Sequence, residues 1–251
     1  DKKIGISIGL YSDMLANNLA DELEVHEHLF EPRDQFVKEK GKEYAESFLS
    51  HFLEKKRMFI RVSQILKPEL QTLSQVKKEE YQKEFDGSLK TLISLEKKTN
   101  FLKENLHLLE ADTIQELVSF STDNMKWIYS VGHDCFQRGQ DEDAFSIFYF
   151  LTFLNHLVFD YWLALGLVQL KLQKDEEALT SFSMASILNP TSAKTRYNSA
   201  LIYLQMHQPK DAFAELEALQ EIIESQNLSG LQESLEKLKK QAEEFLLQQG
   251  G

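Results

Sequence analysis

The sequence has few of the residues that interrupt helices or cross-link chains. Its 251 residues include only 10 glycines, 4 prolines and one cysteine, Cys135. A lone cysteine excludes a disulfide within the chain and is typical of a reducing compartment. Leu, Glu, Lys, Gln and Ala dominate instead, and these residues favour helix. The composition therefore predicts an all-α protein.

Long apolar runs and excess positive charge are also missing. No apolar run reaches the roughly 18 residues that a helix needs to span a bilayer, so no direct membrane insertion is expected. The N-terminal stretch Asp1–Gly9 is too short and broken to be the apolar core of a signal peptide. The net charge of −12 argues against a nucleic-acid partner, because a phosphate backbone requires a basic stripe.

Patterns that carry catalysis or metal binding are absent as well. Cys135 and His133 are two residues apart, so their side chains diverge on a helix, and Cys135 falls at a repeat packing position. His26 and His28 lack the spacing of a helical metal pair, and Asp141–Asp143 lacks the ligand spacing of a calcium loop. No glycine-rich phosphate loop occurs. We therefore expect no enzyme, no cofactor and no metal.

What the sequence does contain is a motif that recurs three times at a fixed spacing. Small residues recur where two helices must touch, and large apolar residues recur where a core must be filled. A period of about 34 residues is typical of tetratricopeptide repeats, in which each repeat is a helix A, a turn and a helix B. The three registered sets are Gly132, Gly166 and Ala200; Ala144, Ala178 and Ala212; and Phe148, Phe182 and Leu216.

The period predicts a tetratricopeptide-repeat solenoid of three repeats, over 125–158, 159–192 and 193–226. Turns between helices A and B are expected at 138–141, 173–175 and 207–210. After Asn227 a last amphipathic helix is expected to cap the solenoid, since the final repeat would otherwise expose its apolar side. Ahead of the repeats, Thr113 and Glu116 form a capping-box pattern for a short helix over about 114–120, and Ser121, Thr122 or Asp123 can cap the first helix A.

The region ahead of the repeats, 1–110, shows no repeat register. We predict a tail and helix over 1–32 and a helical hairpin or bundle module over 33–110, followed by the repeat region 111–226 and the capping helix 227–251. The alternating apolar residues of 1–10 indicate an extended segment, either a free tail or a strand that docks in a groove. Three local features of the module are predicted: Pro68 ends one helix or opens the next, Asp86–Gly87 forms a turn, and spaced leucines from Leu92 to Leu109 form a helical seam.

The side of helix A away from helix B carries one large residue at each of three helical positions in every repeat. Two interpretations stay open: the stripe is core between repeats, or it lines a concave groove that binds an extended apolar peptide. In the second, tyrosine hydroxyls at the rim could bond to the peptide backbone. The candidate groove residues are Tyr129, His133, Phe136, Leu163, Leu167, Leu170, Tyr197, Leu201 and Leu204.

Helix B of the first repeat is apolar on nearly every side. Aromatic and aliphatic residues fill it from Phe145 to Phe159. Such a helix must be covered on more than one face. The candidates to cover it are the N-terminal helices or a second copy of the protein.

The residues of the first repeat and the start of the second resemble a particular family. The stretches are Tyr129–Gly139, Glu142–Ala144, Leu154–His156 and Tyr161–Gly166. They are similar to the SycD/LcrH-type chaperones, the class II translocator-binding chaperones of bacterial type III secretion. Tyr129, His133, Phe136, Gln137 and Gly139 fall on the family pattern of two aromatics followed by Tyr-Gln-x-Gly, although His133 replaces an aromatic. The resemblance covers about 112–226.

This resemblance implies a function as well as a fold. Family members carry three tetratricopeptide repeats and a C-terminal helix, and their groove aromatics bind a short hydrophobic segment of a translocator. It implies a chaperone that keeps a secreted translocator or effector soluble in the bacterial cytoplasm, with a possible homodimer. The alternative is a repeat scaffold or adaptor of a secretion or other complex, in which 1–110 docks on another component.

Overall fold

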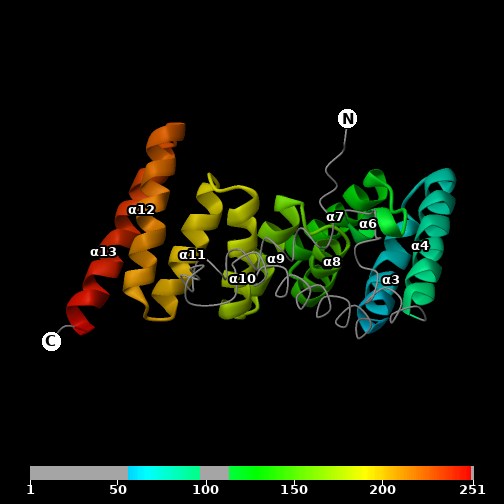
Figure 1. Ribbon diagram of the computed structural model, residues 1–251, viewed down its shortest axis with the longest axis horizontal. Helices are drawn as coiled ribbons and strands as arrows, with labels where there is room; N and C mark the ends of the chain where they lie inside the picture. The colour runs from blue at the N-terminus through cyan, green and yellow to red at the C-terminus, as the bar shows by residue number, and fades with distance from the viewer. Residues whose placement is uncertain (1–55, 97–112, 250–251) are drawn as a thin grey trace, which may run out of the picture. The chain divides into compact units, whose positions relative to one another are not determined.

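Every secondary-structure element in the described part of the chain is a helix. The computed structural model describes residues 56–96 and 113–249 (Figure 1). The predicted all-α fold is confirmed. The predicted tail and helix over 1–32, and the part of the leucine seam from Thr99 to Leu109, lie outside the described residues.

The chain groups into two compact units. The first contains the residues up to Ile128 together with Phe153–Asn155, and the second contains Tyr129–Thr152 and the residues from His156 onward. This grouping does not test the repeat and domain boundaries that the sequence predicts. The division of 1–110 from the rest therefore stays a prediction.

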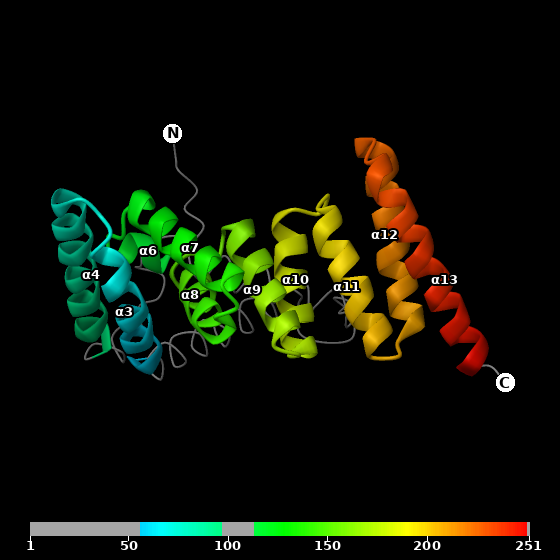
Figure 2. The ribbon, with the colours of Figure 1, turned by 180° about the vertical axis from the view of Figure 1, so that it is seen from behind.

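In the first unit, α3 (Lys56–Leu70) and α4 (Gln75–Glu96) lie side by side in both views (Figures 1 and 2). Large aromatic pairs join the elements of this unit. The Phe59 and Phe153 rings meet edge to face with centroids 5.9 Å apart. Thus a helix of the N-terminal region covers the end of the apolar helix B of the first repeat, as one of the two predicted alternatives required.

Pro68 lies inside α3 rather than at a helix boundary, so that prediction is wrong. Leu66 and Leu70 are both buried and lie one turn apart, so continuing the helix past Pro68 places both in the core. The helix then closes with a backbone bond of 3.0 Å from the Gln71 N–H to the Pro68 carbonyl. The next helix starts at Gln75.

The turn predicted at Asp86–Gly87 is also wrong, because both residues lie within α4. Tyr81, Phe85 and Ser88 share one face of that helix and are 5%, 9% and 2% exposed. Their burial outweighs the cost of about 1 kcal/mol for a glycine in a helix interior. The Ser88 hydroxyl also donates to the Val118 carbonyl at 2.9 Å.

Two predicted helix caps are confirmed in the first unit. The Thr113 hydroxyl accepts from the Glu116 N–H at 3.3 Å at the start of α6 (Ile114–Leu117). The Ser121 hydroxyl accepts from the Asn124 N–H at 3.2 Å and so caps α7 (Thr122–Gln137). The α6 helix is shorter than predicted, because Ser119 takes a left-handed conformation with φ of 59°.

The second unit contains the paired helices that the period predicts. After the C-terminal part of α7 come α8 (Asp141–Leu154), then α9 (Phe159–Lys171) and α10 (Asp175–Leu188), then α11 (Ala193–Gln205) and α12 (Pro209–Gln226). From α9 onward each helix packs on the next, as both ribbon views show (Figures 1 and 2). The second helices of the three pairs begin at evenly spaced positions: Asp141, Asp175 and Pro209.

The small residues of the period mark close approaches between helices. A Cβ atom on Gly132 would lie 2.8 Å from Ile147 Cγ2, and one on Gly166 would lie 2.6 Å from Phe182 Cε1. Both distances are shorter than side chains tolerate, so these positions of α7 and α9 require glycine. Ala200, at the equivalent position of the third repeat, is fully buried.

The turns between paired helices repeat as well. Gly139, Gln173 and His207 occupy equivalent positions of the three repeats and have φ of 73°, 58° and 57°. The left-handed region favours glycine, yet two repeats use other residues there. The repeated conformation therefore comes from the helix-turn-helix geometry and not from glycine alone.

The predicted cap is present after the third repeat. Asn227 ends α12 in a left-handed conformation, and α13 (Gln232–Gln249) packs on α12. Leu235, Leu238 and Ala242 of α13 are buried against the core of the third repeat, whereas Lys237 faces solvent. Among the described helices, none is long and apolar enough to cross a bilayer.

Candidate functional site

The candidate groove residues occupy three helices of the second unit. Tyr129, His133 and Phe136 come from α7. The remaining six are Leu163, Leu167 and Leu170 from α9, and Tyr197, Leu201 and Leu204 from α11. His133 is exposed, and seven others are half-buried. Leu204 is only 2% exposed and belongs to the core with Leu216, so for this position the structure favours the inter-repeat alternative.

The three leucines of α9 are half-buried at the edge of a small core. Leu163, Leu167 and Leu170 pack against a buried cluster of Ala178, Phe182 and Ile202. Each leucine therefore has one side on the protein and retains some accessible apolar surface. This is the arrangement that an apolar binding face requires, because the anchoring side chains are held in place before a ligand arrives.

An aromatic cluster holds Tyr129. Its ring centroid is 5.5 Å from that of Phe148 and 5.7 Å from that of Tyr161. Burial, and then the nearby Asp160 carboxylate, raise the pKa of Tyr129. Burial raises the pKa of Tyr161 to about 12. Both hydroxyls stay protonated over the physiological range, so Tyr129 can donate a hydrogen bond from the edge of the candidate groove.

Phe136 lies beneath a cation that the sequence pattern did not reveal. The Lys171 ammonium is 4.8 Å from the Phe136 ring centroid and 2.7 Å from Asp141 Oδ1. Lys171 comes from the end of α9 and Asp141 from the start of α8, so the contact depends on the packing of the second unit. The positive charge at this end of the stripe is thus already engaged by a ring and a carboxylate.

Two residues between the first and second repeats form a buried polar contact. His156 is 2% exposed, and its carbonyl accepts a hydrogen bond of 2.8 Å from Trp162 Nε1. Burial lowers the pKa of His156 to about 4, so its ring is neutral at pH 7. His156 therefore contacts the start of α9 through its carbonyl, and its ring brings no positive charge to the candidate groove.

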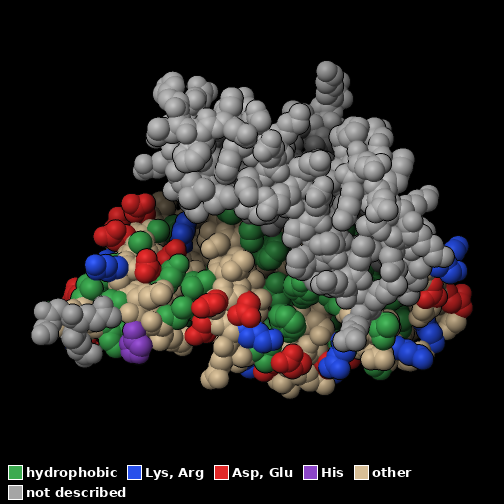
Figure 3. Space-filling model, turned by 60° about the horizontal axis from the view of Figure 1, so that its bottom comes forward, with side chains coloured by type: hydrophobic (Ala, Val, Ile, Leu, Met, Phe, Trp, Pro, Cys, Tyr) green, Lys and Arg blue, Asp and Glu red, His purple; other side chains and the backbone are tan. Residues whose placement is uncertain are grey.

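The titratable side chains of the described residues do not gather into a metal site. No cluster of three or more His, Cys, Asp or Glu side chains within 56–96 and 113–249 could hold a metal ion. Cys135 is 3% exposed, as its repeat position predicted, whereas His133 is exposed. On the face drawn in Figure 3, described acidic and basic side chains are interspersed with apolar ones.

A relative of known name matches the chain in sequence. Low calcium response locus protein H of Yersinia pestis is 28% identical over 111 residues, which are 44% of this chain and 66% of the relative. The chain thus spans just under two thirds of the relative that it matches. This match confirms the resemblance to the LcrH type that the first-repeat residues indicated. No family model matches the chain.

A solved structure shares the fold. A chain of the CopN–Scc3 complex aligns with 53% of this chain and 78% of its own length, at 19% identity and a TM-score of 0.50. This likeness concerns the fold alone and agrees with the all-α repeat solenoid. The Yersinia enterocolitica type III secretion chaperone SycD, in complex with a peptide of the translocator YopD, aligns with 51% of this chain and 97% of its own, at 24% identity and a TM-score of 0.47.

Proposed function

We propose that the protein is a type III secretion chaperone that binds an extended hydrophobic segment of a secreted translocator or effector. The segment would lie along the helix A faces of the repeats and be kept soluble in the bacterial cytoplasm. The role is one of binding and not of catalysis. As in the family that the chain resembles, a homodimer is possible.

One observation carries this proposal: large apolar side chains are held half-buried along α7, α9 and α11 of a repeat solenoid. An extended peptide with apolar anchors would cover them and gain roughly 25 cal/mol for each Å² of apolar surface removed from water. The sequence match to Low calcium response locus protein H agrees with such a role.

In the first step, the full chain is expressed as bait in its native host. The proteins that it retains are identified by mass spectrometry. The apolar segments of any secreted partner are then synthesised and titrated against the purified chain by calorimetry. Leu167→Glu is the test variant, because it places a charge in the middle of the stripe. We expect it to weaken binding at least about tenfold, since a desolvated charge replaces an apolar anchor.

A matched control lies on the other helix of the same repeat. Leu179 of α10 is half-buried and packs against the same cluster of Ala178, Phe182 and Ile202 as Leu167 does. Leu179→Glu should therefore cost the fold a similar amount while leaving the segment bound. Equal binding by Leu167→Glu and the unmodified chain would refute the groove.

The alternative function is a repeat scaffold or adaptor of a secretion or other complex. Its supporting observation is the first unit, whose helices α3 and α4 lie outside the repeats. The same calorimetry separates the two functions. A scaffold would lose its partner on changes in α3 or α4 and keep it with Leu167→Glu.

A further inference from the structure

One row of the candidate groove, which we call the central row, is uneven in its chemistry. His133, Leu167 and Leu201 form this row and occupy equivalent positions of the three repeats, on α7, α9 and α11. The two leucines are half-buried, whereas the histidine is exposed. Among the described residues, the His133 imidazole makes no hydrogen bond, ion pair or ring contact. The central row therefore presents one free polar group beside two apolar anchors.

Contacts on both sides of His133 determine which part of α9 lies across from it. Toward the start of α9, the Tyr129 and Tyr161 rings have centroids 5.7 Å apart. At the end of α9, the Lys171 ammonium lies 4.8 Å from the Phe136 ring centroid. The two helices therefore run side by side in the same direction. Because His133 lies between these contacts on α7, it lies across from the middle of α9.

The stretch of α9 across from His133 is uncharged. Every residue between Asp160 and Lys171 is neutral, and the Lys171 ammonium already pairs with Asp141 at 2.7 Å. On α7 the neighbouring charge is Asp134, which is exposed and turned by about 100° around the helix axis from His133. In the described part of the chain, no carboxylate pairs with the imidazole.

A segment that covers the central row must supply a partner for the imidazole. The apolar anchors exclude water once a segment is bound, and a covered polar group without a partner weakens binding. An imidazole donates a hydrogen bond through a ring N–H. A carboxylate is the strongest acceptor for it among side chains, because the hydrogen bond is then charge-assisted.

We propose that His133 is a specificity-determining residue of the candidate groove and pairs with an acidic side chain of the bound segment. Packed helices lie about 8–10 Å apart and an extended chain advances about 3.3 Å per residue, so contacts with successive repeats fall about three residues apart. The segment thus carries an acidic residue, an apolar residue three positions away for Leu167, and a second apolar residue three positions further for Leu201.

This inference rests on the proposed function, because it names the kind of segment that the groove takes. It also explains how the segment is held in one register. A shift by one repeat would place the carboxylate on Leu167, where it would lose water without gaining a partner.

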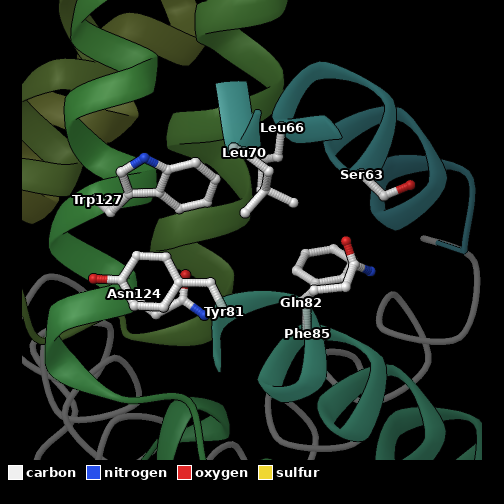
Figure 4. Close-up of a pocket in the computed structure, with 8 residues that line it drawn as sticks. All are labelled: Ser63, Leu66, Leu70, Tyr81, Gln82, Phe85, Asn124 and Trp127. Atoms are coloured by element: carbon white, nitrogen blue, oxygen red, sulfur yellow. The ribbon is translucent and has the colours of Figure 1, made fainter. Parts of the chain in front are cut away.

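The hollow of the first unit does not offer another place for such a segment. It lies between α3, α4 and the first turn of α7, where Tyr81, Phe85 and Trp127 close in around Leu66 and Leu70 (Figure 4). Its volume of about 30 Å³ admits a water molecule and not a side chain. The probes are therefore directed at the central row of the second unit.

The test titrates the full ¹⁵N-labelled chain with matched peptides and follows the His133 imidazole nitrogens by NMR. The acidic probe is acetyl-Glu-Ser-Ala-Leu-Ser-Ala-Leu-amide, and its reversed sequence is measured as well so that both chain directions are covered. Two matched probes carry Gln or Leu in place of Glu. We expect the unmodified chain to bind the Glu peptide about tenfold more tightly than the Gln or Leu peptide, because these lack the charge-assisted hydrogen bond.

Three variants separate His133 from the rest of the groove. His133→Phe should reverse the preference in favour of the Leu peptide, and it removes no packing because His133 is exposed. Asp134→Asn, which is also exposed, should keep the preference for the Glu peptide. Leu167→Glu should weaken the binding of all three peptides.

The outcomes distinguish a failure of this inference from a failure of the groove. The role of His133 is overturned if the unmodified chain binds the Gln or Leu peptide as tightly as the Glu peptide, or if His133→Phe keeps the preference. When Leu167→Glu still weakens binding in that case, the groove stands. If no peptide binds the unmodified chain, or if Leu167→Glu weakens none of them, the groove itself fails and this inference falls with it.

Discussion

The two units of the molecule use glycine differently. In the second unit, small residues at a fixed period let helices approach closely, and Gly132 and Gly166 leave no room for a Cβ atom. In the first unit, Phe85 and Phe120 pack edge to face with ring centroids 5.9 Å apart. Gly87 of α4, by contrast, has no atom within 4 Å of where its Cβ would be.

This difference shows where glycine is a structural requirement and where it is only tolerated. A repeat builds the same interface three times, so a small residue at the contact recurs with the period. The sequence of the first unit shows no such repeat register. The same substitution of a helix glycine should therefore change the free energy of unfolding differently in the two units.

The largest expected effect comes from enlarging Gly166. Its Cβ would lie 2.6 Å from Phe182 Cε1, and Phe182 is fully buried and cannot move aside. We expect Gly166→Val to lower the free energy of unfolding by about 3 kcal/mol through overpacking. Gly87→Val on α4 is the matched control and should change stability by less than about 1 kcal/mol. Equal losses in denaturant melts would break the contrast between the units.

The buried His156 should make the stability of the second unit depend on pH. Above about pH 6.5 the ring is neutral in both the folded and unfolded chains, so it has no effect. Between pH 6.5 and about 4 the unfolded chain binds a proton that the folded chain does not, because burial lowers the folded pKa to about 4. The free energy of unfolding should fall over that window by at most about 3 kcal/mol.

The measurement for His156 compares denaturant melts from pH 7.5 to 4. His156→Gln cannot titrate, so its free energy of unfolding should fall less steeply than that of the unmodified chain. His133→Gln, exposed on α7, should follow the unmodified chain. Parallel pH profiles for the unmodified chain and His156→Gln would show that the imidazole is not held neutral.

A smaller effect of opposite sign is expected at Gly87. It lies in the interior of α4 with open space around it, so alanine meets no obstacle there. Gly87→Ala should raise the free energy of unfolding by about 0.5–1 kcal/mol through helix propensity. The same substitution at Gly166 should lower it. If Gly87→Ala destabilises the chain in thermal melts, α4 is not a continuous helix at that point.

The repeats could be predicted from the sequence because their interfaces recur. The period placed Gly132 and Gly166 at helix contacts and Asn227 at the end of the last repeat, and the structure confirms these placements. The errors fall in the first unit. Asp86–Gly87 has the composition of a turn, and only the burial of Tyr81 and Phe85 explains why the helix continues.

The candidate site was predictable in part for the same reason. Helical spacing groups residues on one face of one helix, so it found Leu163, Leu167 and Leu170 together. It could not find Lys171 over Phe136, because that contact joins different helices. It also could not separate Leu204, which is buried, from Leu201, which is half-buried, because both fit the same stripe.

The central claim is that partners contact the helix A faces of the repeats, and site-specific photo-crosslinking tests it most directly. A benzophenone side chain at position 170 of α9 is compared with one at position 187 of α10, where Ile187 is 38% exposed. We expect position 170 to crosslink to a secreted partner in the native host and position 187 not to do so. Crosslinks to that partner from position 187 alone would contradict the claim.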